Sequence, residues 1–182
     1  MLAGDLYMGN QNQINGTIKE FSSVPEVQIA GEQFTADGAS LNIANNQTYY
    51  FQPGVYGDVR VYSRAIISFQ SGEYFFRSLI IEPDVRVTIN SLSGPVYLKI
   101  VNGLSLGDRT EIINASPGLL LIYSQQTSQL RVGCDVVFTG NIKVPHALVV
   151  CTKIRSDGSA RFRGSIEARA IRLEPDVLID AR

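Results

Sequence analysis

The chain has 182 residues, of which 45% are hydrophobic and 18% are charged, so it can bury the core of one domain and is not of the disordered class. Its 16 basic and 17 acidic residues leave a net charge of −1, which gives no electrostatic reason to expect nucleic acid or an anionic membrane as a partner. No apolar run reaches the roughly 20 residues of a membrane helix, and the start, MLAGDLYMGN, lacks the basic and apolar regions of a signal peptide.

The first 45 residues are less regular than the rest. Short apolar segments at 6–8, 14–18 and 27–29 could form one or two loose opening coils, with SSVPE at 22–26 as a surface excursion. The segment is rich in Gly, Asn and Gln, which suits a polar cap over the end of a stacked sheet. We therefore expect one domain, with an irregular opening or cap at 1–45 and regular coils at 46–182.

Internal repeats begin after residue 46. FQPGVY at 51–56 returns as FQSGEY at 69–74, and FTGNI at 138–142 returns as FRGSI at 162–166. IEPDV at 81–85 returns as LEPDV at 173–177. Glycines recur every 18 to 24 residues, at Gly54, Gly72, Gly94, Gly118, Gly140 and Gly164. Such spacing is typical of one coil of a β-solenoid.

Between the glycines the pattern is that of strands. VRVY at 59–62, VRVTI at 85–89 and ARFR at 160–163 alternate apolar and polar residues, whereas GLLLIY at 118–123 and ALVVC at 147–151 are continuous apolar runs. Few dipeptides typical of hairpins join them, and the repeats preserve strand direction, which argues against an antiparallel sandwich. The sequence predicts an all-β, right-handed parallel β-helix of about six to eight coils.

Aromatic residues crowd into residues 49–76. The main interpretation is a stacked core ladder, in which Phe51 packs on Phe69 and, further along, Phe138 packs on Phe162. Strand alternation would turn some of the other rings outward. We take Tyr56, Tyr62 and Tyr74 as the candidate surface for a carbohydrate or protein partner.

Residues for metal or nucleophilic chemistry are scarce. Cys134 and Cys151 form no CxxC pair; strand parity predicts that both are buried, as core thiols, a disulfide or, less in keeping with burial, a reactive thiol. The single histidine, His146, is expected to be exposed or to cap a turn. HExxH, EF-hand, GxSxG and phosphate-loop motifs are all missing from the sequence, so we expect no metal, no cofactor and no catalytic residues.

The order of these motifs resembles a known family. The tandem coils YFQPGVYGDV and SFQSGEYFFR are followed by GPVYLKIVNGLSL, and the chain closes with FTGNIKVPHALVVC and RFRGSIEARAIRLEPDVLIDAR. From about Tyr49 to Arg182 this is similar to an uncharacterised β-helix domain of bacterial cell-surface proteins. Some members carry type IV pilin-like segments, so the resemblance implies export, an extracellular or cell-surface location and association with pili or the envelope. The family's terminal His-Tyr-Asp is replaced by Leu178-Ile179-Asp180, so no role of that His carries over.

A weaker similarity, through GSIEARAIRLEPDVLIDAR, is to bactofilins, which implies a self-assembling scaffold. The irregular repeat spacing departs from that family. The last strand, 177–182, has no capping segment after it, so we expect its edge to be covered by a neighbouring molecule, by an earlier part of the chain or by further sequence. Self-association through this C-terminal edge is one of those outcomes.

A carbohydrate-active enzyme is the other alternative, because β-helices host lyases and hydrolases. The candidate residues are Glu82, Asp84, Glu174 and Asp176, joined by Arg60 or Arg86. The two acidic pairs are about four coils and thus roughly 19 Å apart, beyond the roughly 5–10 Å between paired glycosidase carboxylates. The sequence therefore favours a non-catalytic structural or adhesive cell-surface domain.

Overall fold

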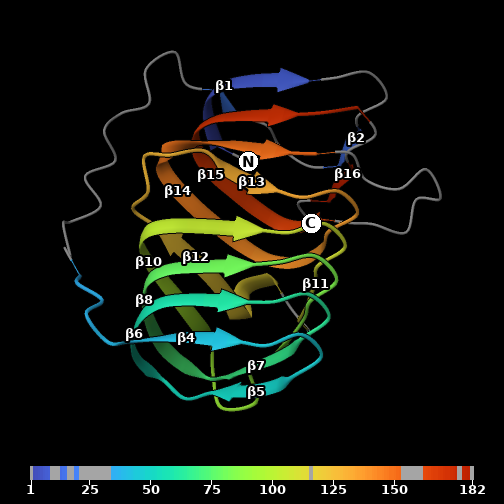
Figure 1. Cartoon of the computed structure of the whole chain (residues 1–182). Helices are drawn as coiled ribbons and strands as arrows, with labels where there is room; N and C mark the ends of the chain where they lie inside the picture. The colour runs from blue at the N-terminus through green and yellow to red at the C-terminus, as the bar shows by residue number, and fades with distance from the viewer. Residues whose placement is uncertain are drawn as a thin grey trace.

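The computed structural model describes residues 34–114, 117–152 and 162–175 in full, and the backbone alone of residues 2–8, 13–15, 19–20 and 178–180. The strands wind into an all-β parallel solenoid of about six turns (Figure 1). Every strand pair in the described part is parallel. The β-helix expected from the sequence is confirmed.

The strands form two faces of one continuous sheet. The first face contains β4 (Ala39–Ile43), β6 (Gly54–Val61), β8 (Gly72–Ile81), β10 (Val96–Leu106) and β12 (Leu120–Ser124). The second contains β5 (Thr48–Phe51), β7 (Ile66–Gln70), β9 (Arg86–Asn90) and β11 (Glu111–Ile113). The long strand β14 (Val137–Cys151) pairs with both β11 and β12 and so joins the faces. β13 (Leu130–Val132), β15 (Phe162–Leu173) and one short 3₁₀ turn (Pro117–Leu119) complete the regular coils.

Coil length changes along the solenoid. Thr48 pairs with Ile66, 18 residues on, whereas Glu111 pairs with Val137, 26 residues on. Corner and turn segments absorb most of the extra residues, and irregularities inside β10 and β14, where the register shifts, absorb the rest. The uneven repeat spacing of the sequence therefore reflects turns of variable length and a few bulges in an otherwise regular stack of strands.

The core is a set of inward columns. Ile67, Val87, Ile112 and Phe138 are consecutive register partners and are all buried. The Phe51 and Phe69 rings stack at 4.8 Å, and those of Phe138 and Phe162 stack at 4.7 Å. All four phenylalanines are at most 4% exposed, so the predicted inward, paired stacking is confirmed.

The repeated FQxGxY motif closes a turn through its tyrosine hydroxyl. The Tyr74 hydroxyl donates to the carbonyl of Gln70 at 2.9 Å and accepts from the Gln70 N–H at 3.0 Å. The Tyr56 hydroxyl does the same with Gln52, at 2.6 and 3.3 Å. Gly72, between Gln70 and Tyr74, has φ +139°, and a Cβ there would lie 2.7 Å from Pro53. Glycine is therefore required at this point of the motif.

One corner in each of five successive coils of the described part carries a left-handed residue. These residues are Asn46, Arg64, Asp84, Arg109 and Asp135, with φ between 55° and 64°. The N–H of each of the first four donates to the carbonyl just before the next corner residue, as Asp84 does to Asp108 at 2.9 Å and Arg109 does to Cys134 at 2.7 Å. This ladder offsets the cost of a conformation that L-residues seldom adopt, and it aligns the corner side chains along the solenoid.

The N-terminal strands lie at the C-terminal end of the stack. β1 (Leu2–Met8) pairs with β15, and β2 (Gln13–Asn15) pairs with β16 (Leu178–Asp180). β3 (Lys19–Glu20) pairs with β1. Figure 1 shows β1 at this end of the stack, with β4 and β5 at the other. An earlier part of the same chain thus covers the C-terminal edge, which was one of the three expected outcomes.

The regular stack begins earlier than expected. β4 pairs with β6, so among the described residues the parallel stack already includes Ala39–Ile43, within the segment where the sequence suggested loose opening coils. Asn45 and Asn46 form a corner between β4 and β5, and this polar pair hides the regularity in the sequence. No helix among the described residues is long and apolar enough to cross a membrane.

The two cysteines differ in burial. Cys151 is 3% exposed, as predicted, and burial raises the pKa of its thiol to about 12. Cys134 is only half-buried, so the prediction for it is wrong. It lies in a corner with Asp135, where a left-handed residue interrupts the strand alternation on which the prediction rested. Both thiols are free, and the Cys134 sulfur lies 3.4 Å from the Thr152 hydroxyl.

Candidate functional site

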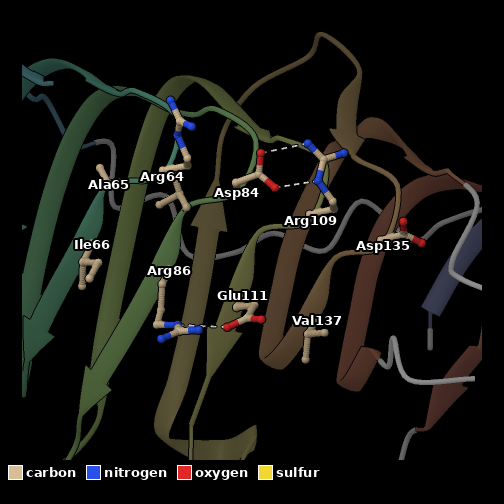
Figure 2. A pocket seen from close by; sticks show the side chains of 10 residues that line it. Arg64, Ala65, Ile66, Asp84, Arg86, Arg109, Glu111, Asp135 and Val137 are labelled. Carbon is tan, nitrogen blue, oxygen red and sulfur yellow. Dashed lines mark hydrogen bonds and ion pairs between the residues drawn. The ribbon is translucent and has the colours of Figure 1, made fainter. Parts of the chain in front are cut away.

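A half-open groove of about 520 Å³ runs along the corner between successive coils (Figure 2). β7, β9, β11 and the start of β14 form its floor, which includes Ile66 and Val137. Its charged lining consists of Arg64, Asp84, Arg86, Arg109, Glu111 and Asp135. The groove crosses several coils, so it suits an extended ligand better than a compact one.

The rim of the groove is the column of left-handed corner residues. Its side chains alternate in charge in the order Arg64, Asp84, Arg109, Asp135. Arg109 donates through Nε and Nη2 to the two carboxylate oxygens of Asp84, at 2.5 and 2.8 Å. This bidentate bond from Arg109 lowers the pKa of Asp84 and raises that of Arg109.

A second ion pair lies on the floor below this column. Arg86 Nε donates to Glu111 Oε2 at 3.0 Å, and the two residues are register partners on β9 and β11 (Figure 2). A general acid at neutral pH needs a carboxyl whose pKa is raised. The pKa of Asp84 is shifted the other way, so its chemistry in the groove is that of a fixed anion.

Arg64 is the exception in the column. Its side chain is exposed and makes no hydrogen bond or ion pair with any described residue. The corner residue before it is Asn46, which carries no charge to pair with it. The charge of Arg64 also helps to lower the pKa of Asp84, so Arg64 adds to the positive potential of the groove without a hydrogen-bonded partner among the described side chains, and such an arginine can bind a carboxylate, sulfate or phosphate of a ligand.

The residues considered for a carbohydrate-active enzyme do not gather in one place in the structure. Glu82 accepts from Arg60 at 2.8 Å, and neither residue lines the groove. Asp84 and Arg86 do line it, each with the partner given above. Glu174 is half-buried, and its N–H bonds the carbonyl of Cys151 at 3.0 Å. Asp176 lies outside the described residues, so the second acidic pair has no described geometry.

The three candidate surface tyrosines do not form one outward row. Tyr74 is 0% exposed, so it cannot contribute to a surface; its ring faces the core because Gln70 holds its hydroxyl. Tyr56 is half-buried and stacks on Phe76 at 5.3 Å. Tyr62 is half-buried under the Arg60 guanidinium, which lies 5.3 Å from the ring centre.

A different group of apolar side chains is exposed. Tyr50, Ile66 and Ile113 are 67%, 41% and 55% exposed, and they lie on the outward side of β5, β7 and β11, the sheet that also holds the groove. Each one neighbours a buried apolar residue, as Tyr50 neighbours Phe51. Runs of consecutive apolar residues hide this outward set in the sequence. Only the parity of the buried partners could have indicated it.

His146 is exposed, in line with the prediction for it. Within the described ranges, no three His, Cys, Asp or Glu side chains are grouped so that they could hold a metal ion. A scan against protein-family models and searches of curated proteins and solved structures find no match to the chain.

Proposed function

We propose that the chain is a non-catalytic structural or adhesive domain of a bacterial cell surface, associated with pili or the envelope. The structural half of this proposal rests on one observation: charged side chains of the protein form ion pairs that join neighbouring coils. Seven ion pairs are described: Arg60–Glu82, Asp58–Arg77, Glu73–Lys99, Asp84–Arg109, Arg86–Glu111, Asp108–Arg131 and Lys143–Glu167. Each one links strands or corners of neighbouring coils.

These pairs engage the acids that a β-helix enzyme would use. Glu82, Asp84 and Glu111 each have an arginine partner within hydrogen-bonding distance. Single exposed pairs stabilise a protein by less than about 1 kcal/mol. Their repetition from coil to coil favours a role in keeping a rod in register.

The adhesive part of the proposal rests on the outward side of the second face. Tyr50, Ile66 and Ile113 offer exposed apolar contact area, and the exposed Arg64 lines the groove together with Ile66. Aromatic and aliphatic groups beside an arginine are a common composition for carbohydrate or protein contacts. The location at the cell surface is supported by the sequence resemblance alone.

Localisation and turnover test the proposal separately. Antibodies against the chain should detect it in the envelope or extracellular fraction of the source bacterium; a cytoplasmic location would contradict the surface role.

Incubation with pectin, alginate and common glycans should yield no product above background. Turnover that is lost in Asp84→Asn and kept in Asp37→Asn, an exposed aspartate away from the groove, would replace the proposal with the carbohydrate-active enzyme.

A further inference from the structure

The two ends of the solenoid differ in how their strand edges are covered. At one end, β4 and β5 each pair on one side only among the described residues, with β6 and β7. Residues 39–52 of this first coil contain no charged residue and no proline. Natural proteins commonly protect such edges with charges or proline, because an unprotected edge accepts another strand.

The opposite edge already accepts a strand from a distant part of the chain. β1 lies parallel to β15 over six register pairs, from Leu2 with Glu167 to Met8 with Leu173. β2 pairs in the same sense with β16 over three residues, 13–15. The paired strands therefore need not be consecutive in the sequence.

We propose that β1, β2 and β3 are an intramolecular plug, and that when they are displaced the C-terminal coil binds the first coil of a second copy of this chain. In such a head-to-tail contact β4 of the second copy takes the place of β1 on β15. The orientation matches, because every described pair of strands is parallel, as β14 with β15 and β5 with β7 are. Self-association through the C-terminal coil, and its block by β1, β2 and β3, go beyond the proposed structural or adhesive role.

The plug favours the monomer through its covalent attachment. A strand tethered to the same chain competes at a high effective concentration with a strand of a second molecule. Its hold is modest in extent, since β2 and β3 contribute three and two residues. Weakening β1 should therefore convert the monomer into open-ended oligomers.

Leu6→Pro in the full chain tests this directly. Leu6 lies inside β1 and pairs with Ile171 of β15. Proline at position 6 removes a backbone N–H and distorts the strand. We expect sedimentation and light scattering to show an average mass that at least doubles across a concentration series, while the unchanged chain stays monomeric. Leu92→Pro is the matched control, because Leu92 is 95% exposed in a turn closed by the Gly94 N–H and the Ser91 carbonyl.

A second route avoids the risk that Leu6→Pro fails to fold. A protease site placed within residues 21–33 lets the folded chain be cut, and chromatography then separates the plug from the solenoid. The cut protein should oligomerise, and a synthetic peptide of residues 1–20 should return it to the monomer. Asn42→Lys with Thr48→Lys, two exposed positions on β4 and β5, should prevent the oligomers.

Three results would overturn the inference. One is a cut, plug-depleted solenoid that stays monomeric at every concentration. Another is a set of oligomers that persists with both lysines in place, since a different surface would then be responsible. The third is an unchanged chain that already associates with its plug bound. None of these outcomes bears on localisation or glycan turnover, so they leave the proposed function standing.

Discussion

Tyr74 illustrates how a single hydroxyl secures a coil. Its ring is fully buried, and its oxygen bonds both the N–H and the carbonyl of Gln70. Tyr56 makes the same pair of bonds with Gln52 at the end of the stack, where it is half-buried. Burial is the largest cause that raises the pKa of both hydroxyls.

Removing these hydroxyls should therefore have unequal effects. Tyr74→Phe removes a buried hydroxyl that bonds two backbone groups of Gln70 in a part-buried site, so we expect a loss of about 1–2 kcal/mol in the free energy of unfolding. Tyr56→Phe, the matched control, should cost less because water can reach Gln52. Urea unfolding measures both. Equal losses, or a larger loss for Tyr56→Phe, would contradict this account of the motif.

The ion pair of Asp84 should make the free energy of unfolding depend on pH in the acidic range. The hydrogen bond from Arg109 lowers the pKa of Asp84 below the ordinary value of 3.8. A carboxyl whose folded pKa is depressed contributes stability that is fully present above its unfolded pKa and is lost as the pH falls through the folded one. Asp84 should thus stabilise the chain at neutral pH and contribute progressively less below about pH 4.

The variant Asp84→Asn tests the predicted direction of this pH dependence. The variant should be less stable than the unchanged chain at pH 7, and the difference should shrink as the pH falls toward 2. Thermal unfolding across that range measures it, with the exposed Asp37→Asn as the control. A difference that grows on acidification would show that the bidentate pair does not stabilise the fold.

At the scale of elements, Phe138 of β14 links three neighbouring strands. It pairs with Ile112 on β11, stacks on Phe162 of β15, and is 0% exposed. Phe138→Ala should lower the free energy of unfolding by about 3–5 kcal/mol, because it removes a buried ring and leaves a cavity. Ile113→Ala, at a position 55% exposed, should change it by less than about 0.5 kcal/mol. Denaturant unfolding of the two variants gives the comparison.

The strands and their inward rings could be predicted because repeats and alternation report on neighbours one coil apart. Phe51 with Phe69, and Phe138 with Phe162, recur in the sequence at the offset at which they stack. The corner residues could not be predicted. Arg64 and Arg109 adopt a conformation that their residue type does not favour, and only the ladder between coils explains it.

The sequence-based predictions that were wrong, and the groove that was missed, have related causes. Cys134 was misplaced because a corner resets the strand alternation just before β14. Tyr74 was assigned to the surface because Tyr74, Phe75 and Phe76 are consecutive aromatics, and alternation alone does not say which of them face the core. The groove joins residues of several coils, so no continuous segment of the sequence contains it.

For the whole molecule, the decisive property is that each coil contacts mainly its neighbours. The first coil has a partner on one side among the described residues, whereas β8 and β10 lie between paired strands on both sides. The placement of β1 on β15 and that of β2 on β16 are long-range exceptions. Pairing between distant segments leaves no local signal, which is why the sequence allowed three ways to cover that edge.

Stability in such a stack should be graded along its axis, since neighbouring coils supply most of the contacts of each. We expect amide hydrogen exchange to be slowest in β8 and β10 and faster in β4 and β5. Phe138→Ala should speed exchange most in β11, β14 and β15, the strands around the lost ring, and least in β5 and β7, which lie further along the stack. Mass spectrometry of peptides from each strand can map this gradient. If the substitution instead accelerated exchange equally in every strand, the solenoid would open as one cooperative unit, and the ion pairs and corner ladder would couple all its coils.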